Sequence, residues 1–343
     1  MKKIANPKSV CLLAHREAGL SLVELMISIT IGLILLAGIS MLIAKESNSR
    51  AELEKSSRQI ENGRYAVELL REDIQHAGYY GDYAVPVAGV NYTSTTLNPC
   101  STDSTNPANL GWTVPNTVPV PVFGYAGAAA KPGCLDNPAP GTAALVIRRT
   151  ATVPTSLAAA EEEATYLQVS RCNSEATPFL LGRPDTINFN LHQNGCVAVA
   201  PLHGYIVRIY YISSCDVCGT DTIPTLKMWE FTEEDDDGRN RSLVEGIENM
   251  QFDYGIDSDG DGSPDSYTVA PTNAEWPNVM AVRVNLLARN NDSTPGYDDG
   301  KSYTLSGESG VPAVVVGPFH DNFKRHAYGE VVRVINPSGR REQ

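Results

Sequence analysis

Four aspartates lie at regular intervals in the stretch DSDGDGSPD, residues 257–265, and this spacing suits cation binding. Alternating carboxylates can converge on one Ca²⁺, which takes six to eight oxygen ligands, and Gly262 stands where such a loop turns sharply. An EF-hand would place an acid at position twelve, where this chain has Thr268, so we expect an EF-like loop between strands. The alternative is a solvated acidic hairpin turn. The candidate ligands are Asp257, Asp259, Asp261, the backbone carbonyl of Ser263, and Asp265.

A second acidic stretch, EEDDDG at 233–238, has consecutive acids that point in different directions, so we interpret it as a hairpin turn. The CDVCG stretch at 215–219 has the CxxC spacing of redox sites and of half a zinc site. Zinc would need a second ligand pair with suitable spacing. The sequence has no other CxxC, and His192 and His203 lie in no such motif. A local structural disulfide is therefore the preferred interpretation.

The cysteines indicate an oxidising compartment. Cys11 lies in the amino-terminal leader, and the other six all follow the long apolar segment. An even set of this kind is typical of disulfides, although six cysteines allow fifteen pairings. We favour pairing between cysteines that are neighbours in the sequence, and the other connectivities stay open. The favoured pairs are Cys100 with Cys134, Cys172 with Cys196, and Cys215 with Cys218.

Charge and motifs exclude other functions. The formal net charge is −13, which argues against nucleic-acid binding, since this needs a basic face. The sequence contains no GxSxG, HExxH or phosphate-loop motif. We therefore expect no enzymatic activity.

The stretch 19–44, GLSLVELMISITIGLILLAGISMLIA, is long and apolar but carries Glu24 near its start. A membrane-spanning helix needs about 20 residues, which the run from Leu20 to Ala44 exceeds. Basic residues in the leader 1–19 favour the cytoplasmic side. A carboxylate in lipid normally has a partner and a function. The alternatives are an uncleaved signal anchor and a glutamate tolerated near the membrane interface.

The segment AGLSLVELMISITIGLILLAGI resembles the class III signal of type IV pilins and pseudopilins. The resemblance implies that prepilin peptidase cleaves after Gly19 and that the new amino terminus, Leu20, is methylated. Leu20 stands where phenylalanine is more usual. The resemblance also implies that Glu24 pairs with the amino group of a neighbouring subunit and sets the axial register of a filament.

The helix is expected to continue past the membrane through residues 45–78, which no proline interrupts. Glu–Arg pairs at i,i+4 support it, and Gly78 and Gly81 are expected to end it. A coiled coil is the competing interpretation. The predicted apolar stripe consists of Leu53, Ile60, Val67, Leu70, Ile74 and Ala77.

The remainder, 79–343, is expected to form a β-rich extracytoplasmic head. Residues 79–140 are rich in Gly, Pro, Thr and Asn, which predicts a long irregular segment held by a disulfide. One long helix followed by strands indicates an α+β fold with an antiparallel sheet. The predicted strands are 144–149, 165–170, 205–213, 225–231, 241–257, 279–289 and 329–335.

The order LVEGIENMQFDYGIDSDGDG and then WPNVMAVRVNLLAR, within 241–289, resembles the PilW-type minor pilins. The GspJ-type minor pseudopilins of type II secretion are close relatives and give the rival interpretation. A rival of another class is a membrane-anchored periplasmic calcium-binding protein or enzyme, which has no use for Gly19 or Glu24.

The resemblance to minor pilins implies a place in the bacterial inner membrane and then at the pilus tip. It implies priming of pilus assembly, and a part in cell adhesion and twitching motility. The implied partners are prepilin peptidase, the inner-membrane assembly platform, other minor pilins, the major pilin and a tip adhesin.

Overall fold

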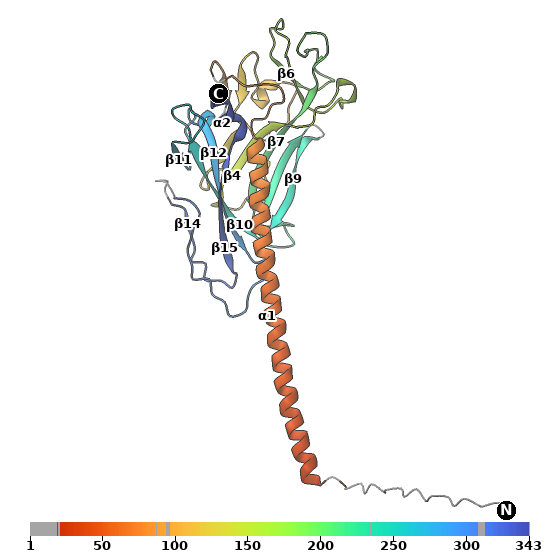
Figure 1. Ribbon diagram of the computed structural model, residues 1–343, viewed down its shortest axis with the longest axis vertical. Coiled ribbons are helices and arrows are strands. Elements are labelled where there is room, and N and C mark those ends of the chain that lie inside the picture. Colours follow the sequence, from red (N-terminus) through yellow and green to blue (C-terminus); the bar gives the residue numbers. More distant parts are fainter. Residues whose placement is uncertain are drawn as a thin grey trace, which may run out of the picture. The chain divides into compact units, whose positions relative to one another are not determined.

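The computed structural model describes residues 19, 21–86, 88–93, 97–232, 235–307 and 313–342, with backbone alone for 235–238 (Figure 1). Leu20 and Cys11 lie outside the described residues. The chain divides into two compact units, Met1–Leu53 and Glu54–Gln343. The second unit contains both the head and the carboxyl-terminal part of the long helix.

Helix α1 runs without a break from Leu22 to His76. It is long and apolar enough to cross a membrane, and its apolar window has no buried residue. Gly78 follows with a φ of +73°, a conformation that glycine adopts easily, so the helix ends where the sequence predicted.

The predicted apolar stripe is only partly correct. Val67, Leu70, Ile74 and Ala77 are buried, whereas Leu53 and Ile60 are exposed. A strict seven-residue spacing drifts around a straight α-helix by about 20° per heptad. The buried face of α1 therefore does not keep the seven-residue spacing. Its buried residues are Gln59, Gly63, Ala66, Val67, Leu70, Asp73 and Ile74.

The larger sheet has seven strands, and its pairings are antiparallel. The order is β3-β4-β7-β5-β6, with β8 joining β7 to β9. The strands are β3 (Val122–Tyr125), β4 (Ala144–Thr150), β5 (Tyr166–Val169), β6 (Phe179–Gly182), β7 (Leu202–Ser213), β8 (Thr225–Thr232) and β9 (Asp235–Glu245).

The smaller sheet has the antiparallel order β11-β10-β12-β15. Its strands are β10 (Ile247–Ile256), β11 (Ser266–Thr268), β12 (Val279–Arg289) and β15 (Arg325–Arg333). Two short pairs join β1 (Asn91–Thr93) to β2 (Thr117–Pro119) and β13 (Tyr303–Thr304) to β14 (Val315–Val316). The remaining helices are η1 (Pro107–Leu110), η2 (Leu157–Ala159), η3 (Trp276–Asn278) and α2 (Ile335–Arg341).

The two faces of the larger sheet bury different partners. Leu145 and Ile147 of β4 share a core with Leu70 and Ile74 of α1 and with apolar residues of β10 and β12. Strands of both sheets thus contact the second half of α1 (Figure 1). Ala144 and Val146, which alternate with them, belong to a second core on the other face.

The segment 79–140 covers this second face. It contributes Trp112 and Val118 to the second core, and its strand β3 extends the larger sheet beside β4. The prediction of a long irregular segment over 79–140 was therefore incomplete, because the short strands β1, β2 and β3 lie within it. Short strands rich in Gly and Pro carry little periodic signal, and their apolar residues are isolated in the sequence.

Two further predictions need correction. The expected single strand 241–257 is divided between β9 and β10 at Gly246, whose φ of +77° lets the chain reverse. The hairpin predicted at the acidic stretch 233–238 is confirmed by the antiparallel pairing of β8 with β9, but it is shorter than expected, because Asp235 pairs with Thr232 and already belongs to β9. Residues 233–234 lie outside the described part of the chain.

Candidate functional site

The start of α1 forms a capping box around Glu24. The backbone N–H of Ser21 donates to Glu24 Oε2 at 3.2 Å, and the N–H of Val23 donates to Ser21 Oγ at 3.3 Å. These bonds satisfy N–H groups that have no partner within the helix. Gly19 and Glu24 are both exposed. The expected cleavage position, Gly19, therefore lies just before a helix start that Glu24 organises.

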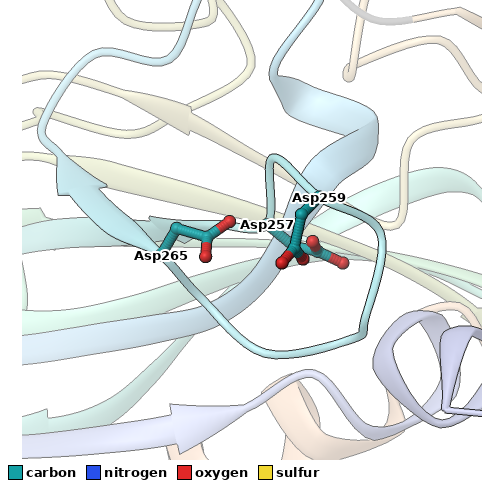
Figure 2. A group of neighbouring side chains, drawn as sticks. All are labelled: Asp257, Asp259 and Asp265. Carbon is teal, nitrogen blue, oxygen red and sulfur yellow. The ribbon is translucent and has the colours of Figure 1, made fainter.

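The Asp-rich loop lies between β10 and β11 and gathers three of its four aspartates. Carboxylate oxygens of Asp257, Asp259 and Asp265 all lie within 4.8 Å of one another. Figure 2 shows Asp265 facing Asp257 and Asp259 across the loop. Asp261 is not part of this group; its carboxylate accepts a hydrogen bond from the backbone N–H of Ser263 at 2.7 Å. Three carboxylates offer oxygen ligands of the kind that Ca²⁺ prefers.

Asp257 is the buried member and already has partners. Its carboxylate accepts hydrogen bonds from the backbone N–H groups of Gly260 at 2.6 Å and Gly262 at 2.9 Å, and from Arg341 of α2 at 2.9 Å. Burial alone would raise the pKa of Asp257, but the bonds from Arg341 and the two glycines outweigh it and lower that pKa. A cation bound here would compete with the Arg341 guanidinium.

Asp265 is held by a different residue of the loop. Ser258 donates to Asp265 Oδ2 from its backbone N–H at 2.7 Å and from its hydroxyl at 2.6 Å. These bonds lower the pKa of Asp265. These contacts favour the ionised form of Asp257 and of Asp265, which is the form that binds a cation.

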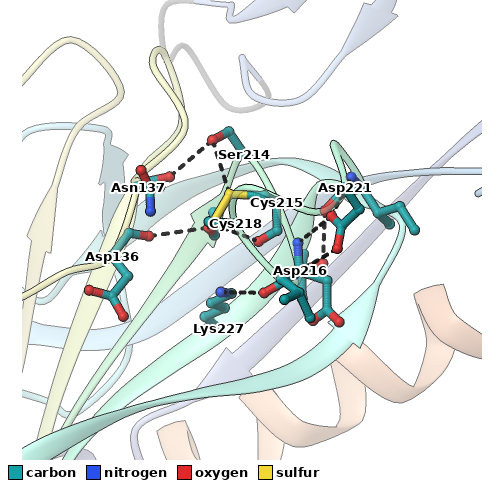
Figure 3. The surroundings of a disulfide bond; sticks show 12 residues. Asp136, Asn137, Ser214, Cys215, Asp216, Cys218, Asp221 and Lys227 are labelled. Carbon is teal, nitrogen blue, oxygen red and sulfur yellow. Dashed lines mark hydrogen bonds between the residues drawn. A yellow bond between two sulfur atoms is a disulfide. The ribbon is translucent and has the colours of Figure 1, made fainter.

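The CxxC motif forms a local disulfide in the turn between β7 and β8 (Figure 3). Asp221 accepts hydrogen bonds from the backbone N–H groups of Asp216, Val217 and Ile223. Lys227 Nζ donates to the carbonyl of Asp216 at 2.8 Å. These contacts describe a structural turn, with both sulfurs already bonded to each other.

The other two disulfides also join sequence neighbours. They are Cys100 with Cys134 and Cys172 with Cys196, the pairs favoured from the sequence. His192 contacts Glu175 at 2.7 Å near the second bond, and His203 bonds to the backbone of Ala151. These bonds link His192 and His203 to Glu175 and Ala151, and neither bond reaches the CxxC turn.

Sequence reasoning missed a buried charge cluster centred on Arg325. The side chains of Arg325 and Asp299 are fully buried, and their N and O atoms lie 2.9 Å apart. Arg325 also bonds to Asp321 at 2.7 Å and to Glu248 at 3.0 Å, and its guanidinium lies over the ring of Phe319. Its members are scattered along the sequence, so only the i,i+4 pair of Asp321 and Arg325 could have indicated it.

A second missed cluster ties α1 to the larger sheet. Asp73, which is buried, accepts hydrogen bonds from Arg149 at 2.7 Å, Arg208 at 3.0 Å and the Tyr210 hydroxyl at 3.0 Å. Burial alone would lower the pKa of Arg208, but Asp73 and Glu230 offset this and raise it. Asp73 therefore fixes the helix to β4 and β7 by charged bonds as well as by apolar contacts.

Comparison with known proteins agrees with this architecture. The family described as type IV pilus-assembly protein W matches residues 209–336, and the prokaryotic N-terminal methylation motif matches residues 14–40. No match was found among curated proteins or among solved structures.

The methylation motif, the long apolar helix and the antiparallel head define a type IV pilin-like protein. It is anchored in the inner membrane with its head in the periplasm. The match over residues 209–336 of the head supports a minor pilin of the PilW type. Pilin-family domains are structural components, and this family takes part in pilus assembly with other pilus proteins.

Proposed function

We propose that this minor pilin primes assembly of the type IV pilus and remains at or near its tip. Its partners would be other minor pilins, the major pilin and a tip adhesin, after processing by prepilin peptidase at the inner-membrane platform. The observation that carries the proposal is that α1 holds the methylation motif at one end and contributes the core of a PilW-family head at the other. A subunit built in this way suits packing among similar helices, and it needs no catalytic activity.

Within that proposal, prepilin peptidase cleaves after Gly19, and the new amino terminus at Leu20 is methylated. Glu24 gives the register between subunits. It is exposed and held at the helix start, so its carboxylate is available to the amino group of a neighbour. Glu24→Ala should keep the protein in the membrane but reduce recovery of partner subunits. Unchanged recovery of partners would contradict this role.

The first experiment compares the major pilin sheared from the surface of three strains, which are the parent, a deletion of this protein, and the complemented deletion. We expect a sharp drop in the deletion strain that complementation restores. An unchanged amount of surface pilin would reject the priming role. Export of secreted proteins by the same strains would then test the pseudopilin alternative, which neither family match favours.

We also propose that the Asp-rich loop binds Ca²⁺, with Asp257, Asp259 and Asp265 as carboxylate ligands. Asp261 and the Ser263 carbonyl would join after a rearrangement of the loop. The convergence of three carboxylates supports this assignment. Addition of a chelator should lower the melting temperature of the full-length protein in detergent. Identical melting curves with Ca²⁺ and with chelator would remove the assignment.

A further inference from the structure

Strand β15 is a free edge of the smaller sheet. Its one strand partner in the described part of the chain is β12, and the pairing runs over nine residues without a register shift. Directly beyond β15, the N–H of Val334 bonds to the carbonyl of Met280. Alternate residues bond to the partner in an antiparallel pair, so the even-numbered residues of β15 bond to β12. The odd-numbered residues therefore point their backbone N–H and C=O groups toward the free edge.

These edge groups have no partner of their own. Ala327, Gly329 and Val331 are exposed, and their N–H and C=O groups make no hydrogen bond within the described residues beyond the sheet. A row of unpaired backbone groups is a template on which another chain can add a strand. β15 therefore offers a set of donors and acceptors to a second polypeptide.

The other edges of the two main sheets are protected in ways that β15 is not. Strands β3, β6 and β11 have only three or four residues each. Strand β9 has 11 residues, but it begins with three aspartates, and its pairing with β8 has two register shifts. Short strands, charges and bulges all hinder edge pairing. β15 is long and contains no proline or bulge, and its exposed residues Ala327, Gly329 and Val331 are uncharged.

Gly329, in the middle of β15, faces away from α1. Tyr328 and Val332 pack in the core that α1 shares, and side chains alternate between the faces of a strand. A Cβ on Gly329 would lie 3.5 Å from Asn285 Oδ1, which is an ordinary contact, and its φ is outside the left-handed region. Neither packing nor backbone conformation therefore requires a glycine here. Glycine weakens a strand, and it often marks a place where another backbone approaches closely.

The absent side chain opens a hollow beside the edge. It has a volume of about 180 Å³ and is lined by Arg283, Asn285, Gly329, Glu330 and Val331. Asn285 lies opposite Gly329 in the pairing, and its Nδ2 donates to Asp253 at 3.4 Å. Its Oδ1 accepts no hydrogen bond within the part of the chain that the structure describes. A side chain with an N–H or O–H group would satisfy this oxygen.

The α1 side of the edge carries a cation without an acid. Burial raises the pKa of Tyr328, and Arg64 of α1 counteracts this in part, so Arg64 lies near β15. Arg71 of the same helix is paired with Glu68 and lies 3.8 Å from Glu330. Arg64 is exposed and has no ion pair among the described residues. An acidic side chain on the α1-facing side of an added strand would complement it.

We propose that β15 is a docking edge, at which an extended segment of another pilus subunit adds a strand to the smaller sheet. This segment places a hydrogen-bonding side chain in the hollow beside Gly329 and an acidic side chain toward Arg64. Main-chain bonds supply its affinity, and the hollow supplies its specificity. That the partner is a pilus subunit rests on the proposed function. A second copy of β15 fits the polar hollow less well, because it would present Ala327, Gly329 or Val331 there.

The docking edge can be tested by placing a charge on it in cells. Val331→Lys in the full-length protein should reduce the recovery of co-purified pilin subunits about tenfold. Val315→Lys is the matched control, because Val331 and Val315 are 48% and 55% exposed and Val315 lies in β14 of another sheet. Equal recovery from the two variants would overturn the docking edge. Arg64→Glu should reduce recovery about threefold, and unchanged recovery would remove the acidic side chain from the assignment.

The hollow can be tested by filling it. Gly329→Val should also reduce the recovery of partners, while the melting temperature of the purified full-length protein stays unchanged or rises, because strands prefer valine to glycine. This combination separates a docking role from a structural one. A lower melting temperature would show that the fold itself needs this glycine, and full recovery of partners would show that nothing enters the hollow. Either result would overturn this part of the proposal.

The molar mass of the purified full-length protein in detergent tests the other occupant. We expect a single copy in each particle. A dimer that Val331→Lys converts to single copies would show that a second copy of this chain occupies the edge, and would reject a different subunit.

These outcomes are separable from failure of the proposed function. If the deletion strain loses surface pili while Val331→Lys retains all partners, the docking edge fails and the priming role stands. If the deletion strain keeps its pili, the priming role fails, and the comparison of Val331→Lys with Val315→Lys still decides whether β15 binds another pilin-like subunit.

Discussion

The Asp-rich loop and the Arg325 cluster each hold three carboxylates close together, but they stabilise the negative charge in different ways. Each gathers three acids from turns and strand ends. In the Arg325 cluster, one fully buried guanidinium lies among Glu248, Asp299 and Asp321. In the loop, Arg341 reaches Asp257, while Asp265 relies on Ser258. The two groups therefore differ in how many acids an arginine reaches: Arg325 contacts all three in its cluster, whereas Arg341 contacts Asp257 in the loop.

The largest effect is expected from removing the cation of the closed cluster. Arg325→Met leaves Asp299 buried without its charged partner and should lower the free energy of unfolding by about 3–5 kcal/mol. Urea unfolding of the full-length protein would measure this, with Arg171→Met as the exposed control. A loss no larger than that of the control would show that the cluster does not depend on Arg325.

The loop should respond to an external cation where the cluster does not. Ca²⁺ at about 100 times its dissociation constant should add about 2.7 kcal/mol, which corresponds to a rise in melting temperature of about 5–10 °C. Asp259→Asn should abolish the rise. Asp298→Asn, at an exposed acid outside the loop, should preserve it. Loss of the rise in both variants would indicate a non-specific effect of charge.

Removing Arg341 should affect stability less than removing Arg325 does, and it should also change the affinity of the loop for Ca²⁺. Arg341→Ala should destabilise the protein by about 1–2 kcal/mol, less than Arg325→Met, because Gly260 and Gly262 still donate to Asp257. The same variant should bind Ca²⁺ more tightly, since a competing cation is gone. Calorimetric titration with Ca²⁺ would measure this, and weaker binding than in the parent would contradict the competition.

The smallest expected effect is on the dependence of stability on pH. The Asp321 pKa is lowered by its bond to Arg325, and the Asp257 and Asp265 pKa values are lowered as well. The unfolded chain therefore takes up protons first as pH falls. The stabilisation is complete above about pH 5 and is lost as pH falls through about 3.9 and below. Melting temperatures between pH 7 and 3 should be flat and then fall, less steeply in Asp321→Asn.

The sequence predicted those parts of the molecule whose pattern is local. The apolar run, the class III signal and the strands at 144–149, 205–213, 225–231 and 279–289 all carry periodic or motif information, and the structure places α1, β4, β7, β8 and β12 there. Strand 329–335 was displaced, because β15 begins at Arg325 and the chain turns into α2 at Ile335.

The parts that were missed depend on contacts between distant residues. Asp73 meets Arg149 and Arg208 only after the helix has packed on the sheet. The loop was foreseen as a set of acids, but the turn at Asp261 and the contact with Arg341 were not. Such contacts depend on which distant residues the fold brings together, and a local sequence pattern does not contain this information.

Helix α1 carries the membrane segment and also contributes to the core of the head, so a force on the membrane segment acts on that core. A pull along the helix axis would be transmitted to the head through the core contacts of Leu70 and Ile74 and through the ion pairs of Asp73. The disulfides bridge only 34, 24 and 3 positions of the chain and do not span this joint. The chain itself continues covalently from α1 into the head, so a force on the helix tests the non-covalent packing of α1 within the head.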